Sequence, residues 1–313
     1  MQSAQTRRRL LATLSCTMAA SAFGGARISA QDAPPETTTI RLAKIPGICV
    51  APQYIAEELL RIEGFSEVRY VDVPLDQVHR AVGSDNIDLS IGFIAQYIIE
   101  LDLATPIVLL SGVHVGCFEL FGNDRVRNIA DLKGKSVGIG GFGSSDHLFL
   151  SVMAAQIGLD PARDIHWVTS QSPRPDELFA EGKIDACLGL PPVPQDLRAR
   201  KIGHVVVNSS LDRPWSQYFC CMLGANQDFV RDHPVATKRA VRAIMKAADL
   251  CASEPARAAR LVVDGGFTPR YDYAQEALSE IPYDKWRDYD AEDSVRFYAL
   301  RLHEIGMVKS SAS

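Results

Sequence analysis

The chain has 313 residues, of which 47% are hydrophobic and 23% charged, a composition typical of a globular protein large enough for two domains. Its 33 lysines and arginines stand against 38 aspartates and glutamates, so the formal net charge is -5. No basic tract follows the N-terminus, so we expect no nucleic-acid partner, and no later segment has the apolar length of a membrane span.

Residues 1–30 have the pattern of an export signal. Arg7–Arg9 form a charged start, a moderately apolar stretch runs to Gly25, and Ala30 offers a cleavage site. Paired arginines followed by two leucines indicate a twin-arginine (Tat) signal, although the general secretory route and an uncleaved anchor stay open. Cleavage would lower the lysines and arginines from 33 to 29 against 38 acidic residues, leaving about -9, so any preference for anions must be local. We predict a periplasmic protein.

An alternation of strands and helices follows a leader at residues 31–39, whose proline, glutamate and threonine content predicts disorder. The strands expected from apolar and alternating runs are Thr39–Lys44, Val68–Val73, Ile87–Gly92 and Ile107–Leu110. The helices expected between them are Gln53–Glu63, Asp76–Val82 and Phe93–Leu101. This order predicts a mainly parallel sheet.

A second α/β series follows a long extended run at Val113–Gly122. Its expected strands are Ser136–Ile139, Ile165–Val168, Ala186–Leu188 and His204–Val207, and its expected helices are Ser144–Ile157, Pro175–Glu181 and Pro194–Arg200. A second extended run covers Ser216–Leu223, and the rest is almost wholly helical.

The fold class predicted from this order is α/β, with two lobes joined by two crossings near Val115–Phe118 and Phe219–Leu223. Lobe 1 would comprise residues 40–115 and 224–313, with the C-terminal helices packing on it, and lobe 2 residues 116–223. Ligands of open sheets bind at the carboxyl ends of the strands, so a cleft between the lobes should be lined by the loops that follow them. These loops are Pro46–Ala51, Gly92–Ala95, Ser111–His114, Gly141–Asp146 and Leu190–Pro192.

The stretch Gly138–Asp146 joins a buried strand to an apolar helix through several glycines and two serines. Such a turn can point backbone N–H groups at a small anion, or it can be an ordinary tight turn. Ser144 and Ser145 could bind the anion or cap the helix. Asp146 could complement the helix dipole, or face the cleft and favour a ligand with an amine or ring N–H. The spacing matches no nucleotide-binding motif.

Other candidates have equally plain structural readings. His114 could hydrogen-bond a ligand through its neutral ring, or be a structural histidine. Phe93 and Tyr218 could form aromatic walls or pack in the core. Pro191 could stiffen a loop wall or simply precede a helix.

Six cysteines lie after residue 30, and their irregular spacing includes no CxxC pair. Adjacent Cys220 and Cys221 would point to opposite faces of a strand, which makes them a poor metal pair. We therefore predict no metal site and no cofactor.

Four segments carry a resemblance to a known family: Ala51–Ala56, Asn86–Gly92, Asp131–Gly138 and Glu181–Ala186. They resemble the nitrate/sulfonate/taurine and thiamine-precursor class of ABC-transporter substrate-binding proteins. The resemblance implies a type II periplasmic-binding-protein fold and delivery of a small molecule to a membrane permease; we expect a monomer.

Carried over by position, ligand contacts in this family fall in the loop after the first strand, the loop after the third strand and the glycine-rich helix start. The predicted ligand-binding residues, together with the cleft candidates above, are Gly47, Ile48, Cys49, Phe93, Ala95, His114, Gly143, Ser144, Ser145, Asp146, Pro191 and Tyr218. Because the first loop is apolar where sulfonate binders often have small polar residues, we expect a small organic anion or heterocycle, sulfonate-like or pyrimidine-like, rather than an inorganic ion.

Cys49 supports an alternative, because a sulfinate desulfinase of this fold has its nucleophile in the same loop. A working nucleophile needs a neighbour that lowers its pKa, and the Ser90–Ala95 loop contains no arginine to hold a sulfinate. A cysteine-dependent enzyme and an extracytoplasmic sensor subunit remain the alternatives to a transport receptor.

Overall fold

The computed structural model describes residues 33–74, 77–84 and 86–310, and the chain from Pro34 onward forms one compact unit. The predicted export signal at residues 1–30 lies outside the described residues. Among those described, no helix is both long enough and apolar enough to cross a bilayer.

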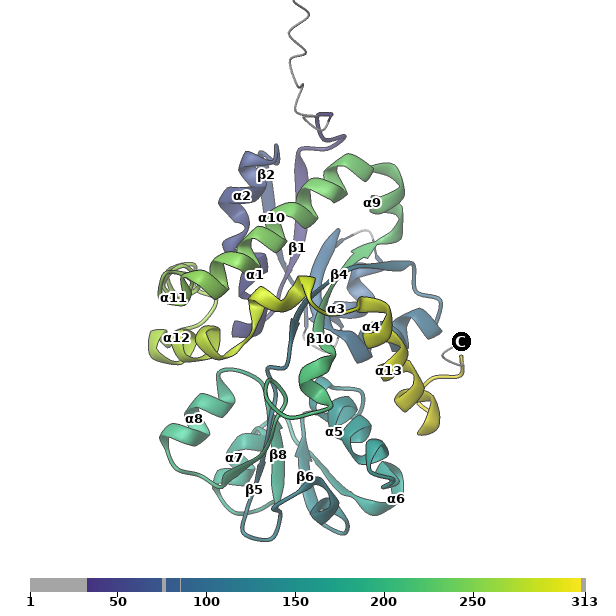
Figure 1. Cartoon of the computed structure of the whole chain (residues 1–313), viewed down its shortest axis with the longest axis vertical. Helices are drawn as coiled ribbons and strands as arrows, with labels where there is room; N and C mark the ends of the chain where they lie inside the picture. The colour runs from purple at the N-terminus through teal and green to yellow at the C-terminus, as the bar shows by residue number, and fades with distance from the viewer. Residues whose placement is uncertain (1–32, 75–76, 85, 311–313) are drawn as a thin grey trace, which may run out of the picture. The chain divides into compact units, whose positions relative to one another are not determined.

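The first sheet has five strands (Figure 1). In spatial order they are β2 (Glu67–Asp72), β1 (Thr39–Lys44), β3 (Leu89–Phe93), β10 (Phe219–Asn226) and β4 (Ile107–Val115). β1 is parallel to β2 and β3, whereas β10 is antiparallel to both of its neighbours. The two inner strands β3 and β10 are buried along their whole length, whereas the edge strand β2 contains only exposed and half-buried residues, which alternate from Glu67 to Tyr70.

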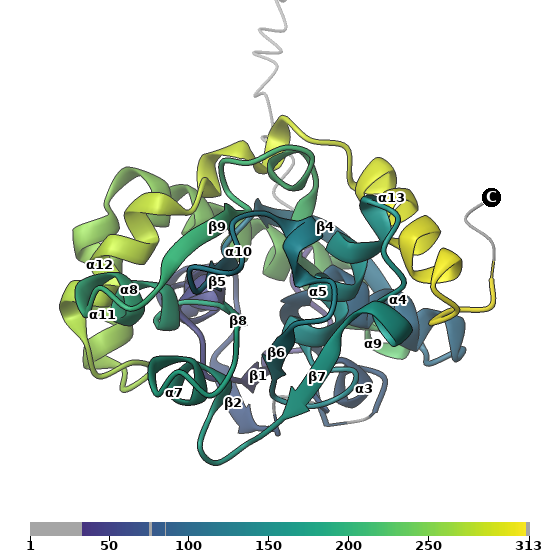
Figure 2. The ribbon, with the colours of Figure 1, turned by 90° about the horizontal axis from the view of Figure 1, so that it is seen from below.

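The second sheet repeats this plan (Figure 2). Its strands are β7 (His166–Thr169), β6 (Ser136–Ile139), β8 (Ala186–Gly189), β5 (Glu119–Gly122) and β9 (His204–Asn208). β6 is parallel to β7 and β8, and β5 is antiparallel to β8 and β9. In both sheets the antiparallel fourth strand is the one that follows a crossing. The predicted α/β class with two sheet-containing lobes is confirmed.

The two crossings between the sheets differ in length. Residues 116–118 connect β4 to β5, and residues 209–218, including the helical turn η3 (Trp215–Gln217), connect β9 to β10. The sequence placed Phe219–Leu223 in the second crossing, but these residues pair with strands of the first sheet. Extended backbone alone could not reveal which sheet the segment joins. The division into lobes at residues 115 and 223 stays a prediction.

Helices surround both sheets near their predicted positions. Around the first sheet lie α1 (Ala51–Ile55), α2 (Glu57–Ile62), α3 (Val78–Val82) and α4 (Ile94–Asp102), the predicted first helix being interrupted at Ala56. Around the second lie α5 (Ser145–Gln156), α6 (Pro161–Asp164), α7 (Pro175–Ala180) and α8 (Val193–Ala199). Two further helical turns are η1 (Ile48–Val50) and η2 (Ile129–Leu132).

The C-terminal helices return to the first lobe, as predicted, and also reach the second. They are α9 (Gln227–Asp232), α10 (Pro234–Ser253), α11 (Pro255–Asp264), α12 (Tyr271–Glu280), η4 (Tyr283–Arg287) and α13 (Ala291–Glu304). α10 packs on α1, α2 and β4, and η4 packs on β4 (Figure 1). α12 touches α8 and α13 touches α5, so the C-terminal region connects both lobes.

The last part of the predicted leader is tied to α10. The carboxylate of Glu36 accepts hydrogen bonds from the backbone N–H groups of Val235 (3.0 Å) and Ala236 (2.9 Å), in the first turn of that helix. An acidic side chain satisfies free N–H groups there and complements the helix dipole. The structure differs here from the expectation of a disordered leader, because the composition of the segment did not reveal this partner.

Candidate ligand-binding site

The glycine-rich stretch has the predicted form, but several of its backbone N–H groups already have partners within the loop. The carboxylate of Asp146 accepts hydrogen bonds from the N–H groups of Gly140 (2.8 Å) and His147 (2.9 Å) and from the hydroxyl of Ser144. The N–H of Gly143 donates to Nδ1 of His147 (3.1 Å). Asp146 therefore occupies the position that the sequence assigned to a bound anion, and its side chain is turned into its own loop rather than outward.

His147 is a partner of the loop that the sequence did not single out. Its ring lies edge-on between Phe142 and Trp167, with both ring centroids 5.0 Å away. Burial lowers the pKa of His147, which suits a neutral ring whose Nδ1 accepts from Gly143. The ring of Phe142 itself is 71% exposed.

The glycine loop is joined to the first lobe by Gln96 of α4. Its side-chain nitrogen donates to the carbonyl oxygen of Gly143 (3.2 Å), and its side-chain oxygen accepts from the hydroxyl of Ser145 (2.7 Å). Gln96 is buried. The sequence missed this residue, although the predicted contact Ala95 stands directly beside it.

The loop after β1 also approaches the second lobe. A side-chain carbon built on Gly47 would lie 3.7 Å from Leu190, next to the predicted contact Pro191. Ile48 and Cys49 are buried in η1. The structure thus brings the first-strand loop and the Leu190–Pro192 loop together, as the cleft prediction requires.

The aromatic candidates lie in packed surroundings. Phe93, at the end of β3, contacts the rings of Phe118, Phe149 and Tyr298 with centroids 5.3 to 5.8 Å apart, so it belongs to an aromatic core between the lobes. The ring of Tyr218 stacks on the ring of Phe297 of α13, with the two centroids 3.9 Å apart.

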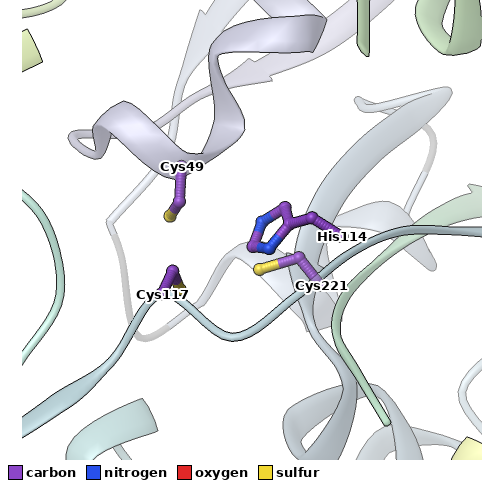
Figure 3. Close-up of side chains that lie close together, drawn as sticks. All are labelled: Cys49, His114, Cys117 and Cys221. Atoms are coloured by element: carbon purple, nitrogen blue, oxygen red, sulfur yellow. The ribbon is translucent and has the colours of Figure 1, made fainter. Parts of the chain in front are cut away.

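Cys49, His114, Cys117 and Cys221 form a buried cluster that the cysteine spacing did not predict. Their ligand-type atoms, three Sγ and one ring nitrogen, all lie within 4.8 Å of one another, and Figure 3 shows the four side chains converging. They come from η1, the end of β4, the first crossing and the start of β10. A fourth thiol, of Cys220, lies 3.4 Å from that of Cys117.

Cys220 and Cys221 both reach Cys117 because the strand is irregular where they stand. The register between β10 and β4 shifts between Phe219 and Cys221 and again before Met222, so the alternation of a regular strand does not apply. No disulfide joins the cysteines of the described chain.

The pKa values of the side chains in the cluster are shifted in different directions. Hydrogen bonds from Cys117 and Cys220 lower the pKa of the Cys221 thiol well below its usual range. The pKa of His114 is raised, because the charge of Cys221 and the backbone contacts outweigh the effect of burial. Cys49 is held differently: despite its hydrogen bond with Cys117, contact with Cys221 and burial raise the pKa of its thiol.

Helix α8 of the second lobe meets α12 through a charged network. Arg198 binds the buried carboxylate of Glu119 (2.6 Å) and also Glu276 (2.8 Å) and Glu280 (2.7 Å) of α12. Burial raises the pKa of Glu119 to about 7. The charge of Arg198 opposes this shift, whereas the charges of Glu280 and Glu276 add to it.

An open hollow of about 610 Å³ lies between β4 and α13, with Leu109, Met222 and Val295 in its lining. Its lining, all within the described part of the chain, includes none of the predicted site residues. We therefore keep the candidate site at the facing loops between the lobes.

Comparisons with known proteins agree with this architecture. Residues 121–263 match the family model described as the NMT1-like family. The alkanesulfonate-binding protein SsuA from Xanthomonas axonopodis pv. citri, solved bound to MOPS, has a similar structure, with a TM-score of 0.72 and 15% identity over 89% of this chain and 96% of that one.

Two further solved structures are similar. The periplasmic nitrate-binding protein NrtA from Synechocystis PCC 6803 has a TM-score of 0.72 and 15% identity, covering 89% of this chain and 84% of its own. The aliphatic sulphonate-binding protein SsuA from Escherichia coli has a TM-score of 0.64 and 18% identity, covering 78% and 84%. At these identities the likeness shows the fold. The comparison with curated proteins found no match.

Proposed function

We propose that this chain, whose residues 121–263 match the NMT1-like family model and whose fold is similar to that of the periplasmic binding proteins, is an exported solute-binding receptor. It would deliver a small molecule to the membrane permease of an ABC importer, acting as a monomer. The observation that carries the proposal is the pair of equally ordered sheets, joined by two crossings and meeting at the loops after their strands.

Closure of the two lobes would be the working motion. Gln96 links α4 to the glycine loop on one side, and Arg198 links α8 to α12 on the other. A ligand that contacts both lobes favours the state in which these links are formed, because it binds that state more tightly than the open one.

Features of the loops support the ligand class that we propose. The first loop offers the apolar Ile48 and the buried Cys49, which suit a carbon-containing ligand. A bare inorganic anion bound by the N–H groups of Gly140 and His147 would have to displace the Asp146 carboxylate from them. The similar structures named above bind alkanesulfonates and nitrate, and we propose a small organic anion or heterocycle for this chain.

A thermal-shift screen of sulfonates, carboxylates, pyrimidines and nitrate tests the proposal. A ligand at a hundred times its dissociation constant stabilises the folded state by about 2.7 kcal/mol, which is readily measured. Stabilisation by nitrate alone would contradict the ligand class, and no stabilisation by any class would contradict the receptor.

A matched pair of variants tests the closure. Gln96→Ala removes the link between the lobes and should weaken binding of the ligand found in the screen. Gln156→Ala removes an exposed glutamine at the end of α5 and should leave binding unchanged. Equal affinity of both variants would show that the Gln96 link does not contribute to closure.

The cysteine-dependent enzyme is separated from the receptor by the reactivity of Cys49. A buried thiol whose pKa is raised is the reverse of an activated nucleophile. Iodoacetamide should therefore label Cys49 slowly at neutral pH, and rapid labelling at that position would favour the enzyme.

A further inference from the structure

The structure assigns a metal site to the cluster of Cys49, His114, Cys117 and Cys221: we propose that these four side chains bind one zinc ion, which fixes the first crossing, through Cys117, to the first lobe. The inference concerns a resident ion and does not depend on the identity of the transported solute. Three thiolates and one imidazole are an established ligand set of structural zinc sites.

The distances fit such a site. Zinc binds sulfur at about 2.3 Å and nitrogen at about 2.0 Å in a tetrahedron, so ligand atoms stand roughly 3.5–3.8 Å apart around the ion. The four ligand-type atoms here lie within 4.8 Å of one another. A contraction of about 1 Å, within reach of small side-chain rotations, would complete the tetrahedron.

His114 provides a second, independent indication. Its Nδ1 lies 2.9 Å from the carbonyl oxygen of Gly116, and because a carbonyl oxygen only accepts, Nδ1 donates. In the neutral ring Nε2 then has a free lone pair, and this buried nitrogen has no hydrogen-bond partner among the described residues. A histidine ligand is commonly oriented in this way, by a backbone carbonyl at its other nitrogen.

The surroundings exclude water and support the ligands. All four residues are buried, and Tyr283 of η4, itself 0% exposed, lies edge-on to His114 at 5.2 Å. The Tyr283 hydroxyl donates to the carbonyl oxygen of Cys49 (2.9 Å), which holds the first-strand loop in place.

The origin of the ligands argues for a resident ion rather than for transported cargo. Cys49 follows β1, His114 ends β4 and Cys221 begins β10, all in the first sheet, and Cys117 lies in the crossing itself. None of the four belongs to the strands or helices around the second sheet. Opening and closing of the lobes would therefore leave the ligand set intact, whereas a cargo site should be completed by closure.

The test is metal analysis of the full chain prepared under reducing conditions. We expect about one zinc per chain to survive exhaustive dialysis, as in structural sites. Replacement by Co²⁺ should give thiolate-to-cobalt charge-transfer bands and the visible spectrum of tetrahedral cobalt. Wild-type protein that retains no zinc and gives no such spectrum overturns the proposal without any variant.

Variants then assign the ligands. Cys117→Ser and His114→Ala should each lower zinc affinity by more than about 100-fold, beyond the 10- to 100-fold typical of changes to the groups around a metal's ligands. Cys187→Ser and Cys251→Ser are matched controls, because both cysteines are fully buried outside the cluster and should retain zinc. His114→Cys keeps a ligand at that position and should restore binding.

Two results would overturn the assignment. One is equal zinc retention by the Cys117→Ser and Cys187→Ser variants. The other is a disulfide between Cys117 and Cys220 in protein isolated from the periplasm, because it would remove one of the ligands; mass spectrometry of unreduced peptides detects it.

Discussion

Replacing Arg198 by alanine should be far more damaging than its position on a charged helix surface suggests. Its guanidinium is the cation beside Glu119, whose side chain is buried in the second sheet. The other carboxylate oxygen, Oε2, is buried without a hydrogen-bond partner among the described residues. Arg198→Ala would leave a buried carboxylate with its cation removed, although Oε1 still accepts from the side-chain amide of Asn208 (3.2 Å). We expect a loss of about 3–5 kcal/mol in the free energy of unfolding at pH 8.

The loss should depend on pH in a defined direction. The unfolded glutamate has a pKa of about 4.3, whereas burial raises the pKa of Glu119 to about 7 in the folded chain. A raised pKa means that its contribution to stability is complete below the unfolded value and is lost as pH rises through 7. At pH 6 the carboxyl group can bind a proton, so Arg198→Ala should be less damaging there than at pH 8.

Urea unfolding followed by circular dichroism at pH 6 and pH 8 measures both effects. Arg200→Ala is the control, because Arg200 is half exposed and pairs with Asp196 one turn away, a contact worth about 0.3–0.5 kcal/mol. Adding Glu119→Gln to Arg198→Ala should recover much of the stability at pH 8. Equal losses in the two arginine variants, or a loss independent of pH, would refute the reasoning.

Two further predictions concern glycines and the glycine loop. Gly92→Ala should lower stability by about 1–3 kcal/mol in thermal unfolding, because the new Cβ would lie 2.4 Å from Nε2 of the buried His79. Gly141→Ala, where no described atom lies within 4 Å of the new carbon, should cost less than about 0.5 kcal/mol, and a larger loss there would contradict the steric argument. Asp146→Ala should cost about 1–2 kcal/mol and, by freeing the N–H of Gly140, make sulfate more stabilising than in the wild type; an unchanged response to sulfate in the same assay would argue against an anion cradle.

The sequence predicted most strands because their burial and their turns are local properties. Ser136–Ile139 was placed to the residue, since an apolar run there stands between a charged turn and a glycine turn. The sequence left the role of Asp146 open. Its carboxylate stands in the first helical turn whether it complements the helix dipole or faces the cleft, and only the conformation of the loop decides where the side chain points. His79 of α3 is buried, because α3 packs on β3 where Gly92 leaves room.

The cysteine cluster could not be found from spacing. Its members stand at positions 49, 114, 117 and 221, so they meet only after β1, β4 and β10 are assembled in one sheet. One indication was present: each lies in or beside a loop or crossing that the α/β pattern directed toward the cleft. The four residues are grouped by combining the predicted positions of the loops with the residue types in them, rather than by the sequence spacing between the cysteines.

The position of β10 bears on the order in which the chain can fold as it is synthesised. β10 lies between β3 and β4, which both pair with it, so the first sheet is divided until residue 226 has emerged. The second sheet needs no strand beyond Asn208 and can be completed earlier. The lobe that begins first therefore finishes last, and until then β3 has an unpaired edge of the kind that promotes misassociation.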